Sequence, residues 1–262
     1  MQYINCEECA AEILAKVQQI PEKKKLVIIT AGDDPASKSY VKGKIKDCTL
    51  CGIPYEHIVM PEEADETDLG MTILRNDWDD EVGGIIVQLP LPSGWDERFL
   101  VSRVWPKKDV DGFVYGSAFL PCTPEGIIYL LKKELGDLSG KNALVIGRGK
   151  LVGKPIAKML LKEDCTVTIA HSKTQNLDEL LAKNDIVVTA AGRAELVDLK
   201  KCNAEVVIDA SINRNEKGKL CGDCFNFDPD TKRDMKVTSV PGGVGLMTRA
   251  MLMKHMGDAS CM

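Results

Sequence analysis

Residues 144–155 read LVIGRGKLVGKP, an apolar run followed by glycines at 147, 149 and 153. A strand, a glycine-rich turn and a helix in this order are typical of dinucleotide-binding folds, because amides at a helix N-terminus attract a pyrophosphate. Gly147 permits a tight turn, and a residue without Cβ at 149 lets a ligand approach closely. The spacing G-x-G-x-x-x-G is one residue longer than the standard fingerprint. Alone, it leaves open a cofactor loop, a simple turn or a degenerate copy.

The strand that follows this loop predicts which cofactor it binds. In NAD-binding folds an acid about twenty residues further on binds the ribose 2′-hydroxyl. Here the run TVTIA (166–170) is followed by His171, Ser172 and Lys173, and Arg148 lies in the glycine loop. A hydroxyl and cations without a carboxylate suit a 2′-phosphate, so the sequence predicts NADP in preference to NAD. The alternative is a set of solvated loop residues.

On both sides of the loop, apolar runs alternate with helical patterns. We predict strands at 26–30, 55–60, 83–92, 142–147, 166–170, 185–192 and 205–210, and helices at 35–51, 64–76, 95–104, 123–136, 152–163 and 176–184. Residues 237–256 are expected to form a strand, a glycine-rich loop and a helix. For the helix at 35–51, Asp34 suits the N-cap, Pro35 the first turn and Gly52 the stop. Such alternation indicates βαβ units, an α/β fold and parallel sheets. The segment 123–136 is the expected link between two domains.

Composition limits the classes of protein. The chain has 262 residues, 44% hydrophobic and 28% charged, with a formal net charge of −5. No basic stripe, apolar span or signal-like start is present, so we expect a cytoplasmic protein without nucleic-acid or membrane partners. Ten cysteines include three C-x-x-C pairs, namely Cys6/Cys9, Cys48/Cys51 and Cys221/Cys224. Their separations fit no zinc module, and we expect reduced thiols and no metal.

Polar residues in the first half suggest a second site. Tyr40 and Lys44 are four apart and share one helix face. Gln88 ends the apolar run GIIVQ, where open α/β sheets place ligand-binding groups. Asp109 and Asp111 lie in PKKDVDGF, and a lone D-x-D is poor evidence for a metal. The plain alternatives are exposed helix residues, a buried amide bonded to backbone, and an ordinary turn.

Seven stretches, taken in order, resemble the bifunctional methylenetetrahydrofolate dehydrogenase/methenyltetrahydrofolate cyclohydrolases. They are DDPASKSYVKGKIK, GGIIVQLPLP, PKKDVDGF, PCTPEGIIYLL, GRGKLVGKP, AHSKT and VPGGVGLMT. The resemblance implies a folate-binding catalytic domain of residues 1–122 plus 245–262, and a Rossmann-like NADP domain of residues 123–244. It implies that the final helix returns to the first domain and that the protein is a homodimer. The implied chemistry is oxidation of 5,10-methylenetetrahydrofolate with NADP, then hydrolysis to 10-formyltetrahydrofolate.

The resemblance also implies residue roles. Lys44 would handle protons in the hydrolysis, Tyr40 would orient the folate, Gln88 would hold Lys44, and Asp111 would anchor the pterin; these four are the expected catalytic residues. The expected substrate-binding residues are Tyr40, Val87, Gln88, Leu89, Asp111, Pro241, Gly242 and Gly243. The expected cofactor-binding residues are Gly147, Arg148, Gly149, Gly153, His171, Ser172, Lys173 and Ile212.

The chain departs from the family pattern mainly on the cofactor side. The loop usually reads G-R-S where Gly149 stands here, and V-I-D-V-G-I-N appears as VIDASIN, with Ala210 and Ser211. The alternatives are a dehydrogenase with weak cyclohydrolase, another two-domain NADP dehydrogenase such as one acting on shikimate-like acids, or a binding module with an impaired cofactor loop.

Overall fold

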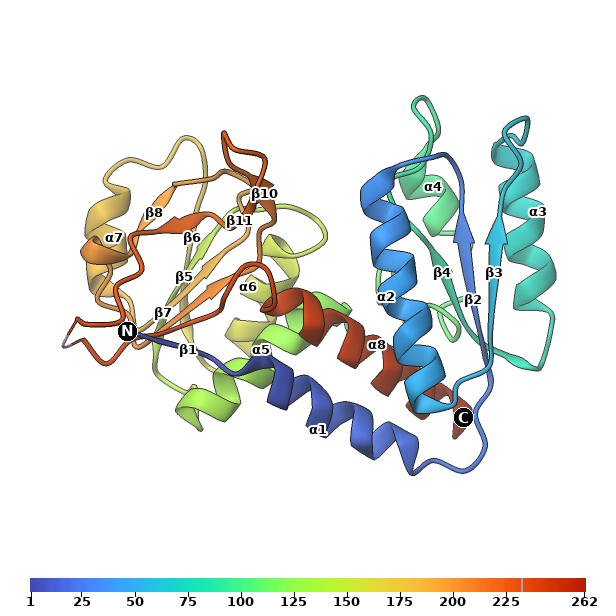
Figure 1. Cartoon of the computed structure of the whole chain (residues 1–262), viewed down its shortest axis with the longest axis horizontal. Coiled ribbons are helices and arrows are strands. Elements are labelled where there is room, and N and C mark those ends of the chain that lie inside the picture. The colour runs from blue at the N-terminus through green and yellow to red at the C-terminus, as the bar shows by residue number, and fades with distance from the viewer. Residues whose placement is uncertain (232) are drawn as a thin grey trace. The chain divides into compact units, whose positions relative to one another are not determined.

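A computed structural model of the chain describes residues 1–231 and 233–262. The chain divides into two compact units, each with its own parallel sheet (Figure 1). The three-stranded unit consists of Ala11–Cys122 and Arg249–Met262, and the six-stranded unit of Met1–Ala10 and Thr123–Thr248. The α/β fold class and the return of the C-terminal helix to the first half of the chain are therefore confirmed.

The three-stranded unit has the strand order β3-β2-β4, with all strands parallel. Its strands are β2 (Lys25–Thr30), β3 (Tyr55–Val59) and β4 (Val82–Val87). Its helices are α2 (Pro35–Cys51), α3 (Glu66–Asp77), α4 (Glu97–Val101) and parts of α1 (Cys6–Gln18) and α8 (Val244–Ser260). The central strand β2 is apolar from Leu26 to Ile29 and fully buried, as expected for a parallel strand covered on both faces.

Helix α2 begins and ends where the local sequence predicts. Asp34 accepts a hydrogen bond from the Ser37 amide at 2.7 Å, and Pro35 occupies the first turn. Gly52 ends the helix in the left-handed region at φ 63°. These signals fix which residues of α2 share a face, and so fix the directions of Tyr40 and Lys44.

The six-stranded unit has the order β1-β13-β9-β7-β5-β6, and its strand pairs are parallel. Its strands are β1 (Gln2–Tyr3), β5 (Asn142–Ile146), β6 (Thr166–Ala170), β7 (Ile186–Thr189), β9 (Val206–Asp209) and β13 (Lys236–Val237). Helices α5 (Cys122–Leu135), α6 (Gly153–Lys162) and α7 (Leu177–Lys183) connect or follow these strands. Because β6 and β7 flank β5 on opposite sides, the strand order reverses beside β5, where doubly wound sheets bind ligands.

The structure differs from the sequence prediction in its smaller elements. The strand expected over 83–92 ends at Val87, because Pro90 and Pro92 have no amide for a ladder. The helix expected over 95–104 is only the five residues of α4. Several two-residue strands were not predicted, because so short a segment has no periodicity. They are β1, β8 (Val197–Asp198), β10 (Asn213–Arg214), β11 (Leu220–Cys221) and β12 (Cys224–Phe225). The 3-10 turn at Leu199–Lys201 was not predicted either. Among the described residues, no helix is long and apolar enough to cross a bilayer.

Candidate functional site

Three polar side chains meet at the carboxyl end of the three-stranded sheet. Lys44 comes from α2, Gln88 directly follows β4, and Asp111 follows a bridge between Ile85 of β4 and Asp109. The Lys44 Nζ donates to Gln88 Oε1 at 3.2 Å and lies 3.8 Å from Asp111 Oδ2. The Lys44 side chain is only 8% exposed and that of Asp111 14%. The chain therefore holds a buried ammonium between an amide oxygen and a carboxylate.

The orientation of Gln88 follows from its backbone contacts. Its side-chain Nε2 donates to the Leu89 carbonyl at 2.8 Å, and its backbone amide donates to the Ile29 carbonyl at 2.9 Å. The Ser37 hydroxyl donates to the same Leu89 carbonyl at 3.0 Å. Since Nε2 is used by Leu89, Oε1 faces Lys44. The alternative that Gln88 is only a buried amide bonded to backbone accounts for its Nε2, which donates to Leu89, but not for its Oε1, which accepts from Lys44.

The expected substrate residues around this cluster differ in exposure. Val87 is buried, Leu89 is half-buried, and Tyr40 is 36% exposed. Burial raises the pKa of the Tyr40 hydroxyl, and the charge of Arg249 opposes that rise. Tyr40 therefore stays a neutral ring at neutral pH, suited to stacking on a flat ligand.

Arg249 of α8 lies against the same helix α2. Its Nε is 2.8 Å from Asp47 Oδ2, and the side chain of Asp47 is 7% exposed. A Cβ added at Gly43 would collide with the Arg249 guanidinium, so glycine there makes room for it. Burial raises the pKa of Asp47, and the Arg249 charge limits this. Sequence reasoning missed this pair because its members are about two hundred residues apart.

Asp109 is a structural residue. Its carboxylate accepts hydrogen bonds from the amides of Gly112 at 3.1 Å and Val114 at 2.7 Å, and its carbonyl accepts from the Ser117 hydroxyl at 3.0 Å. Burial raises its pKa despite these bonds. The D-x-D pair thus has two different tasks, with Asp109 holding the loop that carries Asp111. Within the described part of the chain, no three His, Cys, Asp or Glu side chains gather as a metal site would require.

The glycine loop in the six-stranded unit depends on two of its three glycines. Gly147 has φ +108°, and a Cβ there would collide with the Ala190 carbonyl. A Cβ at Gly153, the first residue of α6, would collide with the Gly147 carbonyl. A Cβ at Gly149 would meet no atom within 4 Å. The long spacing therefore reflects close packing between residues 147 and 153, while residue 149 faces open space.

The turn after β6 carries His171, Ser172 and Lys173, which were expected to bind the 2′-phosphate. The His171 amide donates to Thr174 Oγ1 at 2.9 Å, and the Lys173 amide donates to His171 Nδ1 at 3.2 Å. These bonds leave Ser172 and Lys173 exposed, as is Arg148 in the neighbouring loop. Ile212 is also exposed, beyond β9. No carboxylate follows β6 where an NAD-binding fold would place one, so the electrostatics of this edge suit a phosphorylated ribose.

Next to the cofactor-side loops lies a buried carboxylate that sequence reasoning missed. Asp223 is fully buried and accepts hydrogen bonds from five donors in the described part of the chain, namely Thr189 Oγ1, Ser211 Oγ, Asn213 Nδ2 and the amides of Ala191 and Arg193, at 2.6–2.9 Å. Ser211 Oγ also accepts from the Gly192 amide at 3.1 Å. Burial alone would raise the pKa of Asp223, but these bonds reverse the effect and lower it. The serine that departs from the family pattern is thus part of a bonded network.

The remaining expected folate residues lie in the six-stranded unit. Pro241, Gly242 and Gly243 precede α8, with Gly242 at φ +92°. A Cβ at Gly243 would collide with the Ser239 carbonyl. The structure brings Lys44, Gln88 and Asp111 together in one unit, whereas contact between that cluster and Pro241–Gly243 stays a prediction.

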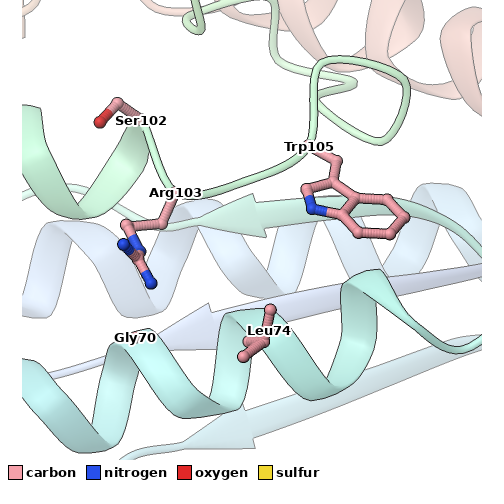
Figure 2. A pocket seen from close by; sticks show the side chains of 5 residues that line it. All are labelled: Gly70, Leu74, Ser102, Arg103 and Trp105. Carbon is pink, nitrogen blue, oxygen red and sulfur yellow. The ribbon is translucent and has the colours of Figure 1, made fainter.

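One hollow contains none of the expected site residues. It has a volume of about 280 Å³ and is lined by Gly70, Leu74, Ser102, Arg103 and Trp105 (Figure 2). Its walls are α3 and the segment after α4. The five lining residues include no carboxylate, histidine or cysteine beside Arg103, and the Ser102 hydroxyl donates to the Phe99 carbonyl at 2.6 Å, so the hollow offers no acid–base pair.

A glycine loop at a strand-order reversal, together with a buried Lys–Gln–Asp cluster on a second parallel sheet, defines a two-unit α/β enzyme that uses a dinucleotide. Family models agree in both halves: residues 4–111 match the catalytic domain of tetrahydrofolate dehydrogenase/cyclohydrolase, and residues 121–261 match its NAD(P)-binding domain. The chain belongs to the tetrahydrofolate dehydrogenase/cyclohydrolase family.

Individual relatives are similar over nearly their whole length. The chain is 47% identical over 241 residues to the bifunctional protein FolD of Bacillus anthracis, covering 88% of this chain and 84% of that one. It is 45% identical to the FolD of Bacillus mycoides, covering 95% and 91%. Among solved structures, the bifunctional enzyme of Campylobacter jejuni is 36% identical with a TM-score of 0.92, covering 98% and 97%. The Trypanosoma brucei enzyme, solved with NADP and an inhibitor, is 30% identical with a TM-score of 0.88, covering 97% and 95%.

Proposed function

We propose that this chain oxidises 5,10-methylenetetrahydrofolate to the 5,10-methenyl form with NADP⁺ and hydrolyses the methenyl form to 10-formyltetrahydrofolate. The observation that carries the proposal is the buried Lys44–Gln88–Asp111 cluster in a chain that also has a complete glycine loop. Family membership and the names of its relatives support both activities.

The six-stranded unit fits NADP. The close-packed glycines 147 and 153 leave the α6 N-terminus open to a pyrophosphate, and no side chain fills the space above Gly149. Arg148, Ser172 and Lys173 are exposed and would hold the 2′-phosphate. When bound, NADP⁺ accepts a hydride.

In the oxidation, the chain binds and orients the folate. The methylene C–H bond breaks with its electron pair, and the two flanking folate nitrogens share the positive charge that results. No proton has to move, so alignment provides most of the catalysis. Asp111 accepts hydrogen bonds from the pterin ring, and the Tyr40 ring lies along the folate. These roles follow from a carboxylate that is 14% exposed and a neutral phenol that is 36% exposed.

The hydrolysis needs a group that moves protons. Water adds to the methenyl carbon and loses one proton to solvent, which leaves a hydroxyl group on that carbon. One carbon–nitrogen bond then breaks as that nitrogen gains a proton and the hydroxyl group loses its remaining proton to become the formyl carbonyl. Lys44 couples the last two transfers, because its ammonium protonates the departing nitrogen and the amine so formed takes the hydroxyl proton, while Gln88 Oε1 holds its Nζ in place. Burial between Gln88 and Asp111 keeps Lys44 in one orientation, which an exposed lysine would not maintain.

A single assay tests the function. The protein is mixed with methylenetetrahydrofolate and either NADP⁺ or NAD⁺, and reduced cofactor and methenyl absorbance are followed separately. We expect reduced NADP without accumulation of the methenyl form. Accumulation would indicate a dehydrogenase with weak cyclohydrolase, and absence of reduction with either cofactor would contradict the enzymatic proposal.

Lys44→Met tests the proton carrier. We expect the variant to keep most dehydrogenase activity and to accumulate the methenyl form. Lys46→Met is the matched control, because Lys46 is an exposed lysine of the same helix. Full cyclohydrolase activity in Lys44→Met would remove Lys44 from the mechanism.

We further propose a cytoplasmic homodimer that pairs through the edge of the six-stranded sheet. Strand β6 is the last in the strand order and carries Ile169, which is 44% exposed; Leu161 on the preceding helix α6 is 58% exposed. An exposed edge with apolar side chains favours pairing with a second copy. Light scattering should give twice the monomer mass for the native chain and a lower mass for Ile169→Lys. A monomeric native chain would contradict this.

A further inference from the structure

His255 of α8 is a buried histidine outside the expected site. It is 1% exposed, and its Nδ1 lies 2.8 Å from the Val110 carbonyl oxygen. A carbonyl oxygen only accepts, so Nδ1 carries the hydrogen and donates it. This contact joins residues 145 apart in the sequence. It acts on the carbonyl of the residue directly before Asp111.

Cys122 also contacts this carbonyl, and Phe119 packs against the His255 ring. The Cys122 thiol donates to the Val110 carbonyl at 3.2 Å, and its Sγ lies 3.5 Å from His255 Nδ1. The Cys122 amide donates to the Asp111 carbonyl at 3.3 Å. The Phe119 ring stacks on the imidazole, with centroids 4.9 Å apart. The backbone is therefore held at the carbonyls of both residue 110 and residue 111.

We propose that His255 is a positioning residue that fixes the Asp111 carboxylate for folate binding. Asp111 lies on a loop, and its carboxylate must keep its place 3.8 Å from the Lys44 ammonium while it accepts bonds from the pterin. The neighbouring Asp109 orders the part of the loop after residue 111, through Gly112 and Val114. His255 orders the part before it. The inference rests on the proposed function only for the identity of the ligand that Asp111 binds.

Three substitutions separate positioning from packing. Asn can place its Nδ2 where His has Nδ1, Gln instead reaches the Nε2 position, and Leu keeps apolar volume without a donor. We expect His255→Asn to bind tetrahydrofolate within about twofold of the native chain. We expect His255→Leu and His255→Gln to bind it about tenfold more weakly, the effect of losing one buried hydrogen bond. The Kd for NADP should stay unchanged in all three.

Calorimetric titration with tetrahydrofolate and hydrogen exchange of residues 108–122 provide the readouts. Met253→Ala is the stability control, since Met253 is on the same helix and contacts Cys48. It should lower the melting temperature without changing the folate Kd. Faster exchange in His255→Leu than in His255→Asn supports the inference whether or not the chain turns over folate. Equal exchange in these two variants, or an unchanged folate Kd in His255→Leu, would overturn it. A chain that binds tetrahydrofolate but reduces neither cofactor would refute the proposed function alone.

Discussion

Replacing Ser211 by glycine restores the family residue at that position, and we expect it to destabilise this protein. The Ser211 hydroxyl donates to the buried Asp223 carboxylate at 2.7 Å and accepts from the Gly192 amide at 3.1 Å. A hydrogen bond to a charged group contributes about 1.5–3 kcal/mol, and one between neutral groups about 0.5–1.5 kcal/mol. Glycine adds backbone entropy to the unfolded chain of about 0.5–1 kcal/mol.

These contributions predict a loss of about 3 kcal/mol in the free energy of unfolding for Ser211→Gly. For a protein of this size each kcal/mol shifts the melting temperature by about 2–4 °C, so we expect a fall of about 6–12 °C. Ser211→Ala removes the hydroxyl but adds less backbone freedom, and should lose about 2 kcal/mol.

Scanning calorimetry is the assay, because the two units can unfold in separate transitions. The transition of the six-stranded unit should move and that of the three-stranded unit should not. A Ser211→Gly protein as stable as the native chain would refute the reasoning. It would mean that water or a shifted backbone satisfies Asp223 and Gly192 equally well.

Four further substitutions test other parts of the structure. Asp77 is buried, and desolvation raises its pKa to about 6. The carboxyl therefore binds a proton more tightly in the folded protein than in the unfolded chain. Its contribution to stability is greatest below about pH 4 and falls as the pH rises through 6. Asp77→Asn should therefore raise the unfolding free energy at pH 8 by about 1 kcal/mol and flatten its pH dependence between 4 and 7, measured by urea titration. In steady-state kinetics, Gly149→Ser should lower the KM for NADP or leave it unchanged, whereas Gly153→Ala should raise this KM at least tenfold. A higher KM in Gly149→Ser than in Gly153→Ala would contradict the loop geometry. Gly43→Ala should displace Arg249 and lose about 1–3 kcal/mol by denaturant unfolding, and a neutral result would show that the guanidinium moves freely.

The sequence predicts those features that depend on neighbours in the chain. The bounds of α2 follow from Asp34, Pro35 and Gly52. Gln88 and the glycine loop directly follow apolar runs, so they were predicted to lie at the carboxyl ends of strands, where parallel sheets bind ligands. The α/β class and the family also follow from local motifs. None of these depends on how distant segments pack.

The features that could not be predicted are contacts between distant residues. His255 meets Val110 across 145 residues, and Asp223 collects donors from β7 and from the segment after β9. No spacing rule connects such residues, since only the fold brings them together. Ser211 shows the result: in the sequence it is a deviation from a glycine, whereas in the structure it is a bonded member of a buried network.

The open space above Gly149 separates two effects of a mutation in this loop, namely the effect on whether the loop can form and the effect on affinity for the cofactor. Residues 147 and 153 are constrained by backbone contacts on the protein's own side, so their identity decides whether the loop can form. A Cβ at residue 149 meets nothing on that side, so a small side chain there faces what binds. A small side chain at this one position can therefore change affinity for the cofactor without a clash against the protein's own backbone, which makes it the natural starting point for engineering cofactor use in this protein.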